Sequence, residues 1–244
     1  MRQNKNGIQA LPRLLNLIYP RRCPVCDEIV GKYGKLICEA CASRLQPVEE
    51  PLCKKCGKPL AREEAEYCPD CGKGKHLFAR GRAAFVYDPL MRESVGRFKY
   101  KNRREYADFY VKELLERCGE TVRAWEADAL IPVPLHPKRK RRRGFNQAGL
   151  IAEGLGKKLG IPVYGRLLVR VKKTRPQKEL SRQERRSNLK NAFQAVQNDV
   201  RLRKVILVDD IYTTGSTIDA AAEVLLALGV EKVYFLSICI GRGY

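Results

Sequence analysis

Residues 205–217 read VILVDDIYTTGST, and this stretch decides the fold. The four apolar residues at 205–208 predict a strand that is buried on both faces, as in a parallel sheet. Two carboxylates and a turn rich in hydroxyls follow, and the apolar periodicity from Ser216 predicts a helix. In α/β proteins, ligands bind where such strands end. The stretch therefore predicts both the fold class and the position of a ligand site.

The turn after the two acids is suited to a phosphate, because a helix N-terminus offers free N–H groups and a favourable dipole. A Walker loop is excluded, since its eight-residue spacing and its lysine are missing. Asp209 and Asp210 repel each other unless they accept hydrogen bonds, which paired sugar hydroxyls would supply. The alternative is an ordinary capped strand-to-helix turn. The proposed phosphate-binding residues are Thr213, Thr214, Gly215, Ser216 and Thr217.

The rest of the C-terminal part alternates between strand and helix patterns. Short apolar runs lie at 83–87, 129–133, 167–169 and 233–236, and helical patterns follow Pro89 and cover 147–159 and 216–228. This alternation predicts an α/β domain at 82–244 with a doubly wound parallel sheet.

Eight cysteines form four CxxC pairs, and the first cysteine of each pair recurs every fifteen residues. Eleven residues separate one pair from the next within each unit, so a short hairpin can bring four sulfurs around one ion. The two predicted ligand sets are Cys23, Cys26, Cys38 and Cys41, and Cys53, Cys56, Cys68 and Cys71.

Four thiolates make a closed tetrahedral site, which favours two structural zinc ions. Iron–sulfur clusters and redox dithiols are the alternatives. Such a small module depends on metal for its stability. We expect it at 21–76, after a short amphipathic helix within 1–20 that serves either for docking or for simple packing.

The net charge of +21, from 48 basic and 27 acidic side chains, predicts a polyanionic partner, with nucleic acid as the leading class. The alternative is a basic surface that only keeps the protein soluble. No secretion signal precedes the cysteines and no apolar run is long enough to span a membrane. We therefore expect a reduced, cytoplasmic protein.

Three stretches carry the basic charge. The first is a run of six cations directly after a predicted strand, for which the alternative is a solvated, flexible loop. The second is 170–186, and the third is 97–104, where aromatics alternate with cations as in proteins that stack bases. Phe98 could equally belong to the core. The six cations are Lys138, Arg139, Lys140, Arg141, Arg142 and Arg143.

Residues 205–217 resemble the binding motif of the type I phosphoribosyltransferases. The resemblance implies that Asp209 and Asp210 hold the ribose 2′ and 3′ hydroxyls of phosphoribosyl diphosphate, that 213–217 hold its 5′-phosphate, and that Mg²⁺ accompanies it. It also implies that 138–143 lie where the related enzymes bind pyrophosphate, and that 170–186 correspond to a loop covering the ligand. Purine-using members commonly have an acid at Thr213, so the threonine argues against purine salvage.

The order of the CxxC units, the VPLHP segment at 133–137, the RGFNQA segment at 143–148 and the diphosphate motif resembles the ComF family. That resemblance implies a double zinc ribbon on a phosphoribosyltransferase domain and a cytosolic role in natural transformation. It further implies binding of single-stranded DNA, and a competence helicase or recombination-mediator proteins as partners.

The sequence is compatible with two functions. In one, the protein is a phosphoribosyltransferase that transfers the sugar to an acceptor and releases pyrophosphate. In the other, the ligand site is a sensor or clamp, and the basic surface and the ribbons hold single-stranded DNA. No base-recognition motif near Asp209 or Arg143 identifies an acceptor.

Overall fold

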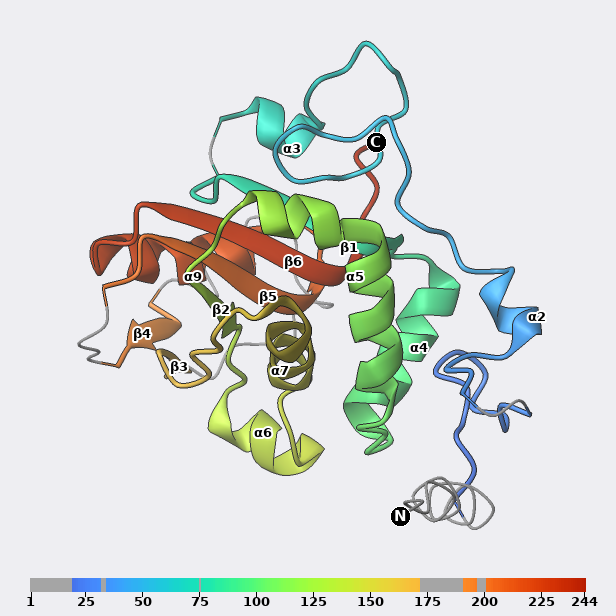
Figure 1. Ribbon diagram of the computed structural model, residues 1–244. Coiled ribbons are helices and arrows are strands. Elements are labelled where there is room, and N and C mark those ends of the chain that lie inside the picture. The colour runs from blue at the N-terminus through green and yellow to red at the C-terminus, as the bar shows by residue number, and fades with distance from the viewer. Residues whose placement is uncertain (1–18, 32–33, 75, 172–190, 197–200) are drawn as a thin grey trace, which may run out of the picture.

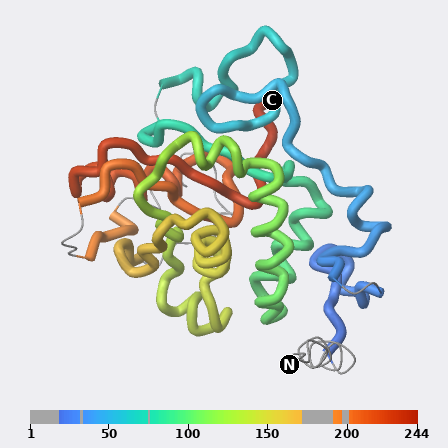
Figure 2. The backbone as a smooth tube through the Cα atoms, in the orientation of Figure 1, coloured from blue at the N-terminus to red at the C-terminus, as the bar shows by residue number. Residues whose placement is uncertain are grey.

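A four-stranded parallel sheet forms the centre of the molecule (Figures 1 and 2). The structure is a computed structural model that describes residues 19–31, 34–74, 76–171, 191–196 and 201–244. The strand order is β1-β6-β5-β2, and every neighbouring pair is parallel. The predicted parallel α/β fold is confirmed. The strands are β1 (Arg80–Val86), β2 (Ala129–Pro132), β5 (Lys204–Tyr212) and β6 (Lys232–Ile240).

Helices cover both faces of this sheet. Alternate side chains of β5 point to opposite faces, as the two-residue period of a strand requires. Ile206 and Val208 pack among α4, α5 and α7, whereas Val205 and Leu207 pack toward α9. Burial on both faces explains why the centre of β5 is wholly apolar. The helices are α4 (Pro89–Tyr100), α5 (Tyr106–Ala124), α7 (Gln147–Leu159) and α9 (Ser216–Ala227).

Strand β5 is longer than its apolar core. It stays paired with β6 as far as Tyr212, opposite Ile240, so the two acids lie within the strand and not after it. The ladder with β6 holds the backbone of Asp209 and Asp210 extended, and the turn begins only at Thr213. The sheet therefore fixes the acids directly.

The prediction that 167–169 belongs to the parallel sheet is wrong. Strand β3 (Leu168–Arg170) pairs antiparallel with β4 (Phe193–Ala195) in a separate two-stranded sheet. Leu168 and Phe193 are buried on the α9 side, whereas Val169 is exposed. A strand with one solvent-exposed face is typical of an antiparallel hairpin. The strands of a parallel sheet are usually buried on both faces.

The CxxC units dock at different places, as Figure 1 shows by the separation of α2 (Glu39–Ala42) from α3 (Pro69–Gly72). The first ribbon, residues 21–45, packs on α4, where Ser94 Oγ donates to the Pro24 carbonyl at 2.8 Å. The second ribbon, residues 51–72, packs beside β1 and the C-terminal end, and the Gly243 N–H donates to the Pro59 carbonyl at 3.0 Å. Of the amphipathic helix expected in 1–20, residues 1–18 lie outside the described ranges.

Within the described ranges, no helix has the length and the apolar character needed to cross a membrane.

Candidate functional site

Two carboxylates lie side by side near the end of β5. The backbone N–H of Asp210 donates to Asp209 Oδ1 at 2.8 Å. Lys99, in the last turn of α4, places Nζ 2.8 Å from Asp210 Oδ1, and both side chains are mostly buried. Asp210 has the same parity along the strand as Val208, which explains why it meets a helix of the α4 face. One acid is thus paired with a cation of the chain itself.

Asp209 has a strongly perturbed pKa. Burial raises the pKa of its carboxyl to about 7, and the charge of Asp210 adds to the rise, whereas the N–H of Asp210 and the charges of Lys99 and Arg170 oppose it. Such an acid is partly protonated near neutral pH until donors or cations stabilise its charge. Perturbed carboxyls of this kind are typical of ligand and catalytic sites.

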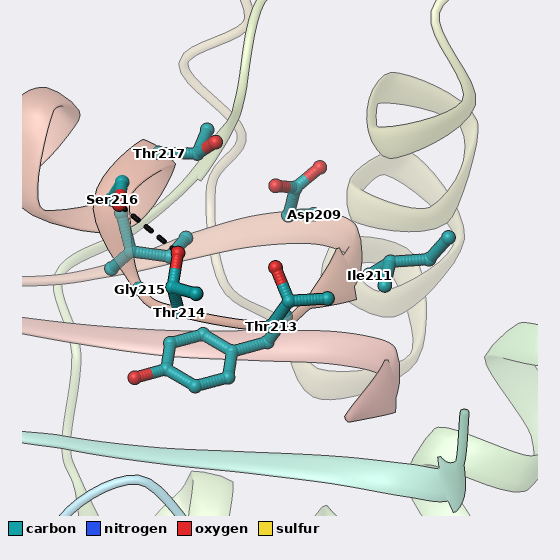
Figure 3. A pocket seen from close by; sticks show the side chains of 9 residues that line it. Asp209, Ile211, Thr213, Thr214, Gly215, Ser216 and Thr217 are labelled. Carbon is teal, nitrogen blue, oxygen red and sulfur yellow. Dashed lines mark hydrogen bonds between the residues drawn. The ribbon is translucent and has the colours of Figure 1, made fainter. Parts of the chain in front are cut away.

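The turn after β5 forms a pocket together with Asp209 (Figure 3). Residues 211–218 complete its lining, and it encloses about 220 Å³ including the solvent at its mouth. The hydroxyls of Thr214 and Ser216 lie 3.0 Å apart, and Ser216 begins α9. The first N–H groups of a helix lack partners within the helix, so this loop has the donors that a phosphate requires.

Gly215 is required by the shape of this loop. Its φ of 78° is in the left-handed region, where other residues are strained. A Cβ at this position would lie 2.7 Å from His76 Cε1 and 2.8 Å from the Tyr212 hydroxyl. The loop therefore passes directly over buried side chains, and only glycine allows that approach.

The run of six cations forms the short helix α6 (Pro137–Arg143), so the flexible-loop alternative does not describe it. The ring of His136 caps its start by accepting from the Lys138 N–H at 3.2 Å, and Gly144 ends it in the left-handed conformation. Cations in the last turn of a helix are favoured by its dipole. Of the second basic stretch, only residues 170 and 171 lie in the described ranges, and Arg170 is close enough to Asp209 to lower its pKa.

The third basic stretch separates into a core part and a surface part. Phe98 is fully buried, so it belongs to the core, whereas Tyr100 is 54% exposed. Arg143 donates to the Tyr100 hydroxyl at 3.0 Å, and the guanidinium carbons of Arg142 and Arg143 lie 5.3 and 4.8 Å from the ring centroid. Burial raises the pKa of Tyr100, but the charge and hydrogen bond of Arg143 outweigh it and lower the pKa. The structure thus brings α6 onto the end of α4.

Each CxxC unit gathers four sulfurs. Within both groups, all the sulfur atoms lie within 4.8 Å of one another. Cys26 Sγ lies 3.8 Å from Cys38 Sγ, and Cys56 Sγ lies 3.7 Å from Cys68 Sγ. A tetrahedral zinc ion with Zn–S bonds of about 2.3 Å separates its sulfurs by about 3.8 Å. The chain therefore carries two tetra-cysteine groups that fit two structural zinc ions.

Within the first group, the backbone around Cys23 favours its thiolate, whereas burial raises the pKa of Cys26 and Cys41. Burial raises the pKa of Cys23, but the backbone N–H groups of Cys26, Cys38 and Val25 stabilise its charge and lower the pKa overall. Since a metal binds the thiolate, this arrangement prepares the sulfur for zinc.

Comparison with known proteins gives the family. Models of the double zinc ribbon domain and of the phosphoribosyl transferase domain match residues 14–72 and 137–243. Competence protein F of Haemophilus influenzae is 39% identical over 57% of this chain and 63% of that protein. The DNA utilization protein YhgH of Salmonella typhi is 34% identical over 63% of this chain and 68% of that protein. The chain belongs to the ComF family. Competence protein ComFC of Bacillus subtilis is 30% identical over 63% of this chain and 60% of that protein.

The match of this ComF-family chain to competence protein F spans less than two thirds of the length of that relative. The two family models match separate parts of this chain, the cysteine-rich part and the α/β part.

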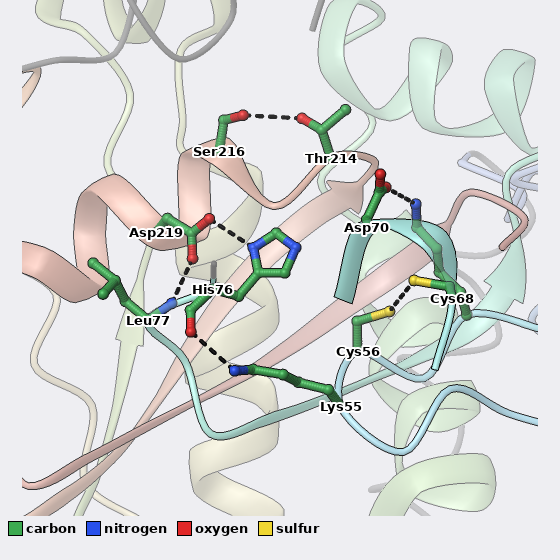
Figure 4. A network of polar contacts seen from close by, with 10 residues as sticks. Lys55, Cys56, Cys68, Asp70, His76, Leu77, Thr214, Ser216 and Asp219 are labelled. Atoms are coloured by element: carbon green, nitrogen blue, oxygen red, sulfur yellow. Dashed lines mark hydrogen bonds and ion pairs between the residues drawn. The ribbon is translucent and has the colours of Figure 1, made fainter. Parts of the chain in front are cut away.

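Sequence reasoning missed two side chains of the site. Lys99 was only one cation in a basic stretch, and nothing in the sequence indicated that it pairs with Asp210. Nothing in the sequence indicates that His76 belongs to the site, yet its Nδ1 lies 2.7 Å from Oδ2 of Asp219, 143 residues along the chain (Figure 4). No local pattern predicts a pair so distant in sequence. Only the docking of the second ribbon on α9 reveals it.

Proposed function

We propose that this protein binds phosphoribosyl diphosphate with Mg²⁺ at Asp209, Asp210 and the loop 213–217, and single-stranded DNA on the adjoining cationic surface. Its role is the handling of incoming DNA in natural transformation, in the cytoplasm. The names of three relatives support this role: competence protein F, competence protein ComFC and DNA utilization protein YhgH.

A single observation carries the proposal. Two consecutive residues of α4 connect the acid pair with the cation run, because Lys99 binds Asp210 and Tyr100 binds Arg143. The basic surface is therefore the rim of the ligand pocket and not a separate patch. A polyanion on this rim would lie beside the phosphate-binding loop.

At the pocket, each group of the chain has a distinct task. The acids accept hydrogen bonds from the ribose hydroxyls, and the N–H groups at the start of α9 donate to the 5′-phosphate. Arg170 lies near enough to Asp209 to lower the pKa of that carboxyl. Burial lowers the pKa of Arg170, and the charge of Arg139 adds to the effect, so both cations lie in the neighbourhood where a diphosphate would need them. Mg²⁺ supplies charge neutralisation for the diphosphate when it is bound.

On the rim, Tyr100 offers a partly exposed ring between arginine side chains. Bases stack on such rings while the cations neutralise the backbone, which binds single strands with little sequence preference. The exposed cations of α6 continue this surface.

Transfer of the phosphoribosyl group to an acceptor is the second candidate. It is favoured by the pKa of Asp209 near 7, which suits a group that exchanges a proton during turnover. Release of pyrophosphate in the presence of candidate acceptors would distinguish a transferase from a ligand-binding clamp.

Two variants test the proposal. Asp209→Ala combined with Asp210→Ala should abolish binding of the diphosphate ligand and leave DNA binding intact. Replacement of Lys138 to Arg143 by serine should weaken DNA binding and flatten its salt dependence. Identical effects of both changes on both ligands would contradict the assignment of separate sites.

A further inference from the structure

His76 connects the second ribbon with the helix that follows the phosphate-binding loop (Figure 4). Its side chain is 1% exposed, and Nδ1 donates to Asp219 Oδ2 at 2.7 Å. The next residue, Leu77, donates its backbone N–H to the other oxygen of the same carboxylate at 2.9 Å. Asp219 lies in the first turn of α9. Two consecutive residues after the ribbon thus hold the start of this helix.

The ring of His76 also supports the loop itself. A Cβ built on Gly215 would lie 2.7 Å from its Cε1 and 2.9 Å from its Nδ1, so the glycine backbone rests directly on the ring. The ring also stacks on Phe78, with centroids 4.9 Å apart. Phe78 packs edge-on against Phe235 of β6. His76 therefore contacts both the loop and the core.

The backbone of His76 is also held by a residue of the second CxxC unit. Lys55 stands between Cys53 and Cys56, and its Nζ donates to the His76 carbonyl at 2.9 Å. Asp70, between Cys68 and Cys71, forms a mostly buried ion pair with Lys58 at 2.9 Å. These contacts depend on the shape of the two knuckles, which zinc determines.

The first ribbon docks on a different part of the molecule. Its contacts lie on α4 and α5, where Ser94 donates to the Pro24 carbonyl and the Tyr106 hydroxyl to Asp27. The two zinc groups therefore stand in different relations to the pocket.

We propose that His76 is a positioning residue of the phosphate-binding loop, and that it couples zinc binding in the second ribbon to ligand binding at 213–217. This inference rests on the proposed function, because the ligand is taken to be phosphoribosyl diphosphate. His76 holds Gly215 in the conformation that presents the N–H groups of the loop. Since coupling between two sites is reciprocal in affinity, bound ligand also tightens the binding of zinc in the second ribbon, and we expect this to slow the loss of that ion.

The first test compares His76→Ala with the conservative variant His76→Asn, whose amide nitrogen can replace Nδ1 as a donor to Asp219. Calorimetric titration with phosphoribosyl diphosphate and Mg²⁺ should show affinity about tenfold weaker for the alanine variant and within about threefold of wild type for the asparagine variant. Tyr106→Phe removes a contact of the first ribbon and serves as the matched control, with unchanged affinity.

A second readout needs no ligand. Amide hydrogen exchange at 213–219 should be faster in zinc-loaded His76→Ala than in wild type, and restored in His76→Asn. Equal exchange in all three proteins would overturn the positioning role, even if wild type failed to bind the diphosphate. Absence of binding by wild type would instead overturn the proposed function, so the two failures are distinguishable.

A third readout tests the coupling. Zinc release to a colorimetric chelator should have two phases, and saturating phosphoribosyl diphosphate should slow one of them in wild type but not in His76→Ala. If the ligand slows both phases or neither, the second ribbon has no special relation to the loop and the coupling is refuted.

Discussion

Among single residues, Asp209 shows most clearly how the site differs from an ordinary surface. Its pKa is raised from 3.8 to about 7, first by burial and then by Asp210. A raised carboxyl pKa in the folded state means that folding favours the protonated form. The cost of ionisation is absent below pH 3.8, grows between pH 3.8 and 7, and is constant above that range.

Asp209→Asn should therefore stabilise the protein at pH 8, by on the order of 1 kcal/mol, and leave stability unchanged near pH 4. The measurement is thermal unfolding of both proteins across this pH range. A gain that is equal at both pH values would show that Asp209 ionises in the fold as it does in the unfolded chain.

Gly215→Ala tests the close approach of the loop to His76. The left-handed conformation alone costs another residue about 1–2 kcal/mol, and the added methyl group meets His76 and Tyr212. We expect lower stability by denaturant unfolding together with loss of diphosphate-ligand binding. Gly160→Ala also has a positive φ but nothing near its Cβ. This control should lose stability without losing the ligand.

Tyr100→Ala should weaken binding of a single-stranded oligonucleotide about tenfold, because base stacking on an aromatic ring contributes roughly 1–3 kcal/mol. Tyr67→Ala removes a ring of similar exposure in the second ribbon and is the matched control. Fluorescence anisotropy with a labelled oligonucleotide measures both. Equal losses of oligonucleotide affinity in the two variants would contradict a specific role of Tyr100 at the end of α4.

Among the elements, α6 collects the densest charge of the chain on one short helix. Lys140→Ser with Arg141→Ser should reduce the slope of log affinity against log salt by roughly 1.4, about 0.7 for each lost phosphate contact on a single strand. Lys157→Ser with Lys158→Ser removes two exposed cations from the end of α7 and should leave the slope unchanged. A similar change of the slope in both double variants would mean that DNA binding depends on the overall positive charge and not on α6.

The helices and strands of the structure can be compared with those predicted from the sequence. Strands with continuous apolar runs and helices with clear periodicity were predicted well, and 147–159 was predicted with the bounds of α7. The assignment of 167–169 failed because three residues do not distinguish a parallel strand from an antiparallel hairpin. The ladder with β6 extended β5 through charged residues, an effect of tertiary pairing that no local pattern contains. The contacts of Lys99 and His76 were missed for the same reason.

Across the whole molecule, the two zinc groups differ in their relation to the core. Cys56 is fully buried in one cluster with Phe78 and Phe235, whereas Cys26 lies at the edge of a small separate cluster. The second ribbon is thus part of the main core on the α9 face. The first has its own small hydrophobic cluster and is docked on α4.

Cys56→Ser should therefore lower the main unfolding transition of the protein by about 5 °C or more, and Cys26→Ser should shift it by less than about 2 °C. Differential scanning calorimetry of the zinc-loaded proteins measures the difference. Equal shifts would mean that the ribbons contribute alike to the core.

The most direct test of the central claim is calorimetric titration of the zinc-loaded protein with phosphoribosyl diphosphate and Mg²⁺, with and without a saturating single-stranded oligonucleotide. We predict binding of one ligand per chain, loss of that binding in the Asp209→Ala, Asp210→Ala double variant, and a shift in affinity when the oligonucleotide occupies the rim. Absence of binding in both conditions would contradict the account of the pocket.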